Sequence, residues 1–229
     1  MTFEKRNIAV LGGTGKEGGG LALRWAHAGH DVIIGSRDGG RAREAADRMN
    51  AALGRANVRG AANAEAAAQA DIICLAVPYA AQAPTVQEVA GALKGKILID
   101  VTVPLVPPKV SHVQLPGGRS AVEMVQRLLG PDVRVVSAFQ NISAHHLANL
   151  DETVDCEVLV CADDDEAADL VTELARDIGL TAWKAGPLCN SVVAEGLTSV
   201  LIALNRHYKV PGSGIRITGI PVSASTGRE

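Results

Sequence analysis

The chain has 229 residues, a formal net charge of −3 and 47% hydrophobic residues. This size and composition are typical of a globular protein with one sizeable core, and the charge favours neither nucleic acid nor an anionic membrane as a partner. No run approaches about 18 unbroken apolar residues, and the charged start leads directly into a predicted strand. We therefore expect a cytoplasmic protein without a signal peptide or a membrane span.

The first predicted unit is a strand at Ile8–Leu11, followed by a glycine-rich loop and a helix. Gly13, Gly15 and Gly18 give this loop the spacing G-x-G-x-x-G. In a βαβ unit that spacing lets the backbone turn tightly and approach a pyrophosphate at the N-terminus of the helix. An ordinary strand–helix turn is the alternative, but the strand before and the helix after favour a dinucleotide site.

The second predicted strand, Asp31–Gly35, ends in Ser36 and Arg37, about 20 residues after the glycine loop. An NAD site usually has a carboxylate at this point to bind the ribose 2′-hydroxyl. Here a hydroxyl and a cation replace it, and Arg can pair with a 2′-phosphate. A helix predicted over Gly40–Leu53 brings Arg41 near the same position. The pattern predicts NADP rather than NAD.

Strands and helices alternate through the rest of the chain. Further helices are predicted at 63–69, 84–93, 121–129, 166–178 and 191–207, and strands at 71–77, 96–101, 133–139, 156–161 and 180–184. This order predicts an α/β fold: a Rossmann-type parallel sheet in residues 1–150, with a smaller C-terminal α/β extension in residues 151–229 on the same core. Residues 214–219 alternate like a short edge strand.

The segment 102–118 is rich in Pro and Gly, so it cannot be a central strand or a regular helix. A loop at the carboxyl end of a parallel strand is a natural wall for a ligand pocket. An exposed linker is the alternative interpretation.

The sequence contains no pattern for a catalytic triad or a metal cluster. His145 and His146 are adjacent at the start of a predicted helix, so their side chains diverge. Three acids at 163–165 are explained by helix capping. We predict no catalytic side chain and no metal, which suits hydride transfer because that reaction depends on proximity and orientation.

The predicted helix at 191–207 is strongly apolar. We expect it to cover the sheet or to form a subunit contact, which makes a homodimer the expected assembly.

Five blocks of sequence resemble the NADP-dependent oxidoreductases of the deazaflavin coenzyme F-420. In chain order they are Val10–Gly15, Gly35–Arg37, Ala185–Ser191, Glu195–Thr198 and Gly214–Ile217. The resemblance spans nearly the whole chain and implies reversible hydride transfer between NADPH and coenzyme F-420.

The resemblance also implies the site residues. Those expected to hold NADP are Thr14, Gly15, Lys16, Glu17, Ser36, Arg37, Arg41, Val77, Ala81, Val103 and Ala144. The first four would bind the pyrophosphate, largely through backbone N–H groups. Those expected against the deazaflavin are Val103, Pro104, Gln140, Asn141 and Ile142, with the Gln140 amide hydrogen-bonding a deazaflavin carbonyl.

Two alternatives stay open. One is an NADPH-dependent reductase of another acceptor, such as a flavin, a ferric chelate or an imine. The other is a non-catalytic module that senses NADP. An enzyme is favoured because the loops after Val101 and Phe139 are placed to build a second pocket, which a sensor does not need.

Overall fold

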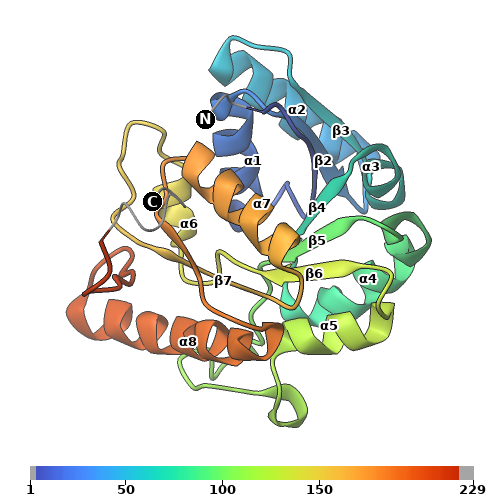
Figure 1. The fold of residues 1–229 in the computed structure, drawn as a ribbon. Helices are drawn as coiled ribbons and strands as arrows, with labels where there is room; N and C mark the ends of the chain where they lie inside the picture. Colours follow the sequence, from blue (N-terminus) through green and yellow to red (C-terminus); the bar gives the residue numbers. More distant parts are fainter. Residues whose placement is uncertain (1–3, 222–229) are drawn as a thin grey trace.

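Eight strands form one sheet in the computed structural model, which describes residues 4–221 (Figure 1). Their order across the sheet is β3-β2-β1-β4-β5-β6-β7-β8. The strands are β1 Asn7–Leu11, β2 Asp31–Ser36, β3 Val58–Ala62, β4 Ile72–Leu75, β5 Ile97–Asp100, β6 Arg134–Ser137, β7 Val158–Ala162 and β8 Ala182–Lys184. The helices are α1 Lys16–Ala28, α2 Gly39–Leu53, α3 Asn63–Gln69, α4 Tyr79–Leu93, α5 Ala121–Leu129, α6 Ala144–Leu147, α7 Asp165–Asp177 and α8 Ser191–Tyr208.

The strands bury both faces, and each face has its own apolar cluster. On β2, for example, Val32 and Ile34 face the cluster that contains α1, α2 and α7, while Ile33 faces the cluster under α3, α4 and α5. Side chains alternate along a strand, so a continuous apolar run serves both clusters. Figure 1 shows the two helical layers with the sheet between them.

Strands β1 to β6 pair in parallel, as expected for a Rossmann-type sheet. The direction changes at one place: β7 runs antiparallel to β6, and β8 then runs parallel to β7. The α/β fold class is therefore confirmed, with a reversal in the C-terminal extension. The β7–α7–β8 unit has the βαβ form predicted for it.

Three local predictions were wrong or incomplete. Helix α4 begins at Tyr79, five residues before the expected start, and accepts Pro84 in its interior. Strand β3 was missed because its sequence has little β-forming character, and Gly60 is there because an added Cβ would overlap the backbone of Ala42 in α2. Residues 214–219 form no strand, although Glu157 N–H donates to the Ile215 carbonyl.

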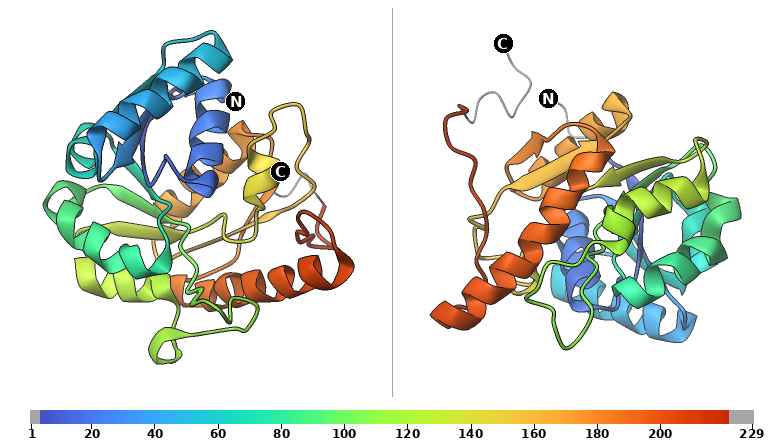
Figure 2. Two further views of the ribbon diagram at one scale, coloured as in Figure 1. Left: turned by 180° about the vertical axis from the view of Figure 1, so that it is seen from behind. Right: turned by 90° about the horizontal axis from the view of Figure 1, so that it is seen from below.

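Helix α8 crosses the end of the molecule next to the loop that contains residues 102–118 (Figure 2). A Cβ added at Gly196 of α8 would lie 3.3 Å from Val113 of that loop. Among the described residues, Leu188–Tyr208 is the one helical stretch long and apolar enough to cross a membrane by length and composition. About a third of this stretch is buried, where α8 packs against α5 and β7, and one such helix is weak evidence of a membrane span.

Candidate functional site

The glycine loop holds the backbone at the carboxyl end of β1. Gly12 has φ +85°, and a Cβ added there would overlap the carbonyl oxygen of Ala76 after β4. Gly12 was not part of the predicted glycine pattern, yet it is the loop position with a left-handed backbone. Gly15 caps α1 without a side-chain hydrogen bond, so the N–H groups of the first turn are left for an anionic ligand.

One cavity, of about 600 Å³, runs from this loop to the end of β2. It collects seven of the residues predicted to hold NADP: Thr14, Gly15, Ser36, Arg37, Arg41, Val77 and Ala81. The lining residues that the sequence did not indicate are Gly12, Asp38, Asn63, Ala76, Pro78 and Thr85.

The β2 end of this cavity is positively charged. Asp38 is engaged as the N-cap of α2, where its Oδ1 accepts from Gly40 N–H at 2.8 Å and from Arg41 N–H at 3.3 Å. Within residues 4–221 the guanidinium groups of Arg37 and Arg41 have neither an ion pair nor a hydrogen bond, and both residues are exposed. Two free cations beside the start of a helix suit a phosphate group.

A second cavity, of about 470 Å³, opens at the carboxyl ends of β1, β4, β5 and β6. It collects eight predicted residues: Gly15, Lys16, Glu17, Val77, Val103, Gln140, Asn141 and Ile142. The two cavities share Gly15, Ala76, Val77 and Pro78 in their linings, so they meet beside the glycine loop. An extended ligand can therefore occupy both.

Two predicted residues lie outside both linings. Pro104 is buried next to Val103, and Ala144 starts the short helix α6. Of the segment 102–118, Thr102, Val103 and Leu105 line the second cavity. The prediction of this segment as a pocket wall therefore holds for its first residues.

Helix α8 supplies lining residues that sequence reasoning missed. They are Thr198, Leu201, Ile202 and Asn205, joined by Ser213 after the helix. Thr198 and Asn205 are seven residues apart, which places both on one helical face. That polar spacing within an apolar helix was the signal in the sequence that could have indicated them.

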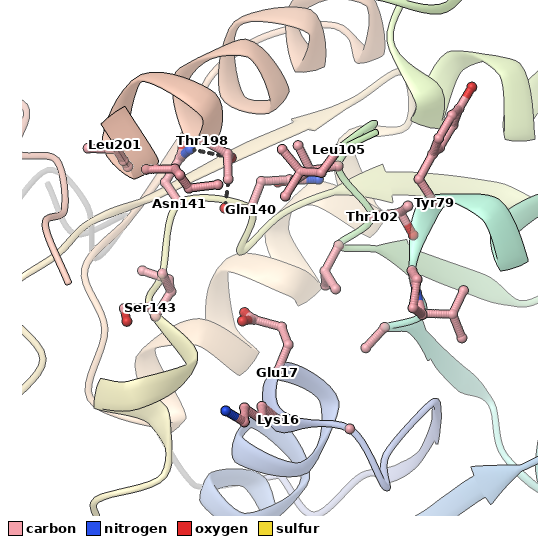
Figure 3. Close-up of a pocket in the computed structure, with 18 of the residues that line it drawn as sticks. Lys16, Glu17, Tyr79, Thr102, Leu105, Gln140, Asn141, Ser143, Thr198 and Leu201 are labelled. Carbon is pink, nitrogen blue, oxygen red and sulfur yellow. Dashed lines mark hydrogen bonds between the residues drawn. The ribbon is translucent and has the colours of Figure 1, made fainter. Parts of the chain in front are cut away.

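Hydrogen bonds tie α8 to the loop after β6 (Figure 3). Thr198 Oγ1 donates to the Gln140 carbonyl at 2.9 Å, and Asn141 Nδ2 donates to the Ala194 carbonyl at 2.8 Å. Phe139, in a left-handed conformation at φ +72°, turns the chain into this loop. The ring of Phe139 packs edge-on against Trp25, with ring centroids 5.7 Å apart.

Asp100 ends β5, directly before the lining residues Val101, Thr102 and Val103 of the second cavity, and is fully buried. Its Oδ2 accepts from Gln82 Nε2 at 2.6 Å and its Oδ1 from Thr102 N–H at 2.9 Å. Burial raises the pKa of Asp100 to about 6, while these hydrogen bonds act in the opposite direction. The Asp100 carboxyl therefore positions the loop after β5.

Hydrogen bonds to the ends of β5 and β6 orient the Gln140 side chain. Its Nε2 donates to the Asp100 carbonyl and to Ser137 Oγ, both at 2.8 Å. Its Oε1 is buried without a partner, as is Thr102 Oγ1. Gln140 therefore uses its amide hydrogens within the fold and keeps a buried acceptor without a partner, so its expected hydrogen bond to a deazaflavin carbonyl stays a prediction.

Glu17 enters the second cavity from the first turn of α1 (Figure 3). Its Oε1 is buried without a hydrogen-bond partner. Burial raises the pKa of Glu17 from 4.5 to about 8. The resemblance had implied this residue for pyrophosphate binding, largely through its backbone N–H group.

The two adjacent histidines are not directed at one point. His146 contacts Glu152 through Nδ1 at 2.6 Å, whereas His145 is exposed. The part of the chain that the structure describes contains no group of three or more metal-ligating side chains.

Comparisons with known proteins agree with this geometry. The family described as NADP oxidoreductase, coenzyme F-420-dependent, matches residues 7–104. An F-420-dependent NADP reductase of Methanothermobacter marburgensis is 45% identical over 221 residues, covering 93% of this chain and 99% of the relative. A reductase of the same name from Methanocaldococcus jannaschii is 41% identical over 223 residues, covering 94% and 99%.

A solved structure points the same way. The protein, from Arthrobacter sp. FB24 and proposed to be an F-420-dependent NADP-reductase, superposes with a TM-score of 0.77 at 28% identity. The match covers 93% of this chain and 99% of that one. The likeness therefore includes the C-terminal part that carries α8.

Proposed function

The chain belongs to the family of NADP oxidoreductases dependent on coenzyme F-420, and we infer that it transfers a hydride between NADPH and this deazaflavin. The observation that carries the inference is the junction of two cavities at Gly15 and Val77. One cavity has the shape and charge for a dinucleotide, and the other leaves room for a second ring system beside it.

Within the first cavity, the residues divide the work of holding NADPH. The uncapped first turn of α1 binds the pyrophosphate through backbone N–H groups. Arg37 and Arg41 pair with the 2′-phosphate, and Ser36, the last residue of β2, lines the cavity beside them. Val77 and Ala81 give the dinucleotide an apolar wall towards the second cavity.

In the second cavity, the deazaflavin supplies a ring carbon that accepts the hydride. This chain supplies two buried acceptors, Gln140 Oε1 and Thr102 Oγ1, for N–H groups of the bound rings. Leu105 and Leu201 add apolar contact. Holding two reactants in one orientation is worth about 7–11 kcal/mol of the barrier, so no protein nucleophile is needed.

The two alternatives make different demands on the second cavity. An NADP sensor has no use for a 470 Å³ space opening onto the nucleotide site. A reductase of another acceptor does use it, and differs only in which acceptor binds.

The test is an absorbance assay with purified protein, NADPH and oxidised coenzyme F-420. We expect the deazaflavin band to bleach with NADPH and much less with NADH. NADPH binding without bleaching would contradict the proposed acceptor and favour a different one. No binding of NADPH would contradict the nucleotide site itself.

We also propose that the protein is a cytoplasmic homodimer that associates through α8, with no membrane or nucleic-acid partner. The support is the exposed apolar side chains along this helix: Val193, Val200, Leu204 and Tyr208. Light scattering after size exclusion measures the mass, and Val200→Asp should convert a dimer to monomers. A wild-type mass of about 24 kDa at micromolar concentration would overturn the proposal.

A further inference from the structure

We propose that Glu17 is the proton-carrying group of the second cavity, giving up its proton when a hydride leaves NADPH and recovering it in the reverse reaction. This inference rests on the proposed hydride transfer. It assigns to the side chain a role distinct from the pyrophosphate binding expected of the Glu17 backbone.

The position of the carboxyl is the first support. Glu17 projects from the start of α1 into the cavity, with Ser143 on one side and Thr102 and Tyr79 on the other (Figure 3). Because α1 begins at the pyrophosphate loop, this carboxyl lies where the dinucleotide passes from the first cavity into the second.

The second support is that the fold does not use this carboxyl. Its Oε1 is shut off from solvent and has no hydrogen-bond partner. A buried polar atom without a partner costs roughly 1–3 kcal/mol, so a purely structural residue here would be apolar. The orphaned oxygen indicates a role that appears when ligands occupy the cavity.

Burial favours the neutral form of the Glu17 carboxyl in the free protein. Lys16 precedes it on α1 and is exposed. The other ionisable groups near this region are Tyr79 on α4, which lines the cavity, and Cys74 on β4, which interacts with both Asp100 and Glu17. Burial, rather than any of these groups, is what raises the pKa of Glu17.

Proton balance gives the neutral carboxyl its function. Reducing a deazaflavin takes one hydride and one proton, whereas NADPH supplies only the hydride. The O–H bond of Glu17 breaks, an N–H bond forms on the reduced acceptor, and the carboxylate remains beside an oxidised nicotinamide that has gained a positive charge. That charge stabilises the carboxylate until solvent returns the proton.

This role makes a thermodynamic prediction that needs no turnover. NADP⁺ should favour the ionised carboxyl and NADPH the neutral one, so the ratio of the two affinities should depend on pH. Between pH 6 and 8 we expect the affinity for NADP⁺, divided by that for NADPH, to rise by up to about tenfold per pH unit. The 2′-phosphate, which also titrates near pH 6, is common to both ligands and cancels in the ratio.

The experiment measures dissociation constants of NADP⁺ and NADPH by calorimetry from pH 6 to pH 9. Wild type should show the rising ratio, and Glu17→Gln should show a flat one while still binding both nucleotides. Glu17→Gln should also slow single-turnover reduction of coenzyme F-420 by at least about tenfold. Glu88→Gln, on the exposed side of α4, is the matched control and should behave as wild type.

A flat ratio in the wild type would overturn the inference, and this result does not depend on whether any variant folds. A Glu17→Gln protein that titrates like the wild type would overturn it equally. Failure of the wild type to reduce coenzyme F-420 would instead contradict the proposed function, so the two failures are distinguishable.

Discussion

Replacing Arg37 by Gln tests the assignment of NADP as the nucleotide. Arg37 follows β2 at the rim of the first cavity, and within residues 4–221 its guanidinium has no competing partner. The substitution should therefore remove a contact with the 2′-phosphate without breaking a contact in the fold. NADH lacks this phosphate and serves as the internal reference.

The expected size follows from the chemistry of the contact. A hydrogen bond to a charged group contributes about 1.5–3 kcal/mol, which corresponds to an affinity change of roughly tenfold to a hundredfold. Since Arg37 is exposed, salt weakens the interaction, and the effect should shrink as ionic strength rises from 0.05 M to about 1 M, where the Debye length is about 3 Å.

The assay titrates NADPH and NADH separately and adds adenosine 2′-monophosphate as a probe of the phosphate site alone. Arg37→Gln should weaken NADPH and the probe and leave NADH within about twofold. The Arg37→Gln, Arg41→Gln double variant should lose less than the sum of the single losses if both residues bind one phosphate. Arg127→Gln, exposed on α5 away from both cavities, is the control. Equal losses for NADPH and NADH would refute the reasoning.

Three further predictions concern the free energy of unfolding. Gly12→Ala should lower the free energy of unfolding, measured by chemical denaturation, by at least about 2 kcal/mol, because Gly12 has a left-handed backbone and no room for a Cβ. The control Gly91→Ala, with no atom within 4 Å of the added Cβ, should instead stabilise α4 by about 0.5–1 kcal/mol. Arg24 donates to four carbonyls between His146 and Glu152, so Arg24→Met should cost about 2–4 kcal/mol in urea unfolding, and Arg24→Lys should not restore it. The pKa of Glu17 is about 8 in the folded state against 4.5 in the unfolded state, so protonation of Glu17 stabilises the folded state fully below pH 4.5, and this stabilisation is lost as the pH rises through 8. Glu17→Gln should therefore increase the free energy of unfolding by about 2–4 kcal/mol at pH 8.5 and leave it unchanged at pH 4.5. Melting temperatures of both proteins at the two pH values check this.

Most of the parallel core of the fold could be predicted because strands β1, β2, β4 and β5 are continuous apolar runs. Helices 63–69 and 121–129 were predicted to the residue, since Ser120 and Glu123 form a capping box that fixes the start of the second one. Strand β3 was beyond prediction because Gly60 serves contact with α2, a tertiary demand. The start of α4 was misplaced because Pro84 indicates a first turn, yet here it removes only one backbone hydrogen bond.

The candidate site likewise contains residues that the sequence could locate and residues that it could not. Residues next to strand ends, such as Ser36 and Arg37, could be located because topology alone brings them to one edge. Thr198 and Asn205 gave only the weaker signal of their seven-residue spacing, since the sequence does not say over which end of the sheet α8 packs. The direction of the Gln140 amide could not be predicted either, because it depends on Asp100 of β5 as well as on the nearby Ser137.

The distribution of unpaired polar atoms ties these observations together. Among the described residues, seven buried side-chain nitrogen or oxygen atoms have no hydrogen-bond partner, and four of them belong to residues that line the two cavities: Glu17, Asn63, Thr102 and Gln140. Each such atom costs roughly 1–3 kcal/mol in the free protein. The free-energy cost of these four unpaired atoms is removed when a ligand with matching polar groups binds in the cavities. These atoms lack hydrogen-bond partners in the free protein and gain them in the complex. The new hydrogen bonds therefore add to the affinity for a nicotinamide and a deazaflavin ring bound together. An acceptor of similar shape without N–H groups would leave Gln140 and Thr102 unpaired, and this difference allows the pocket to select its substrate without any charged contact to it.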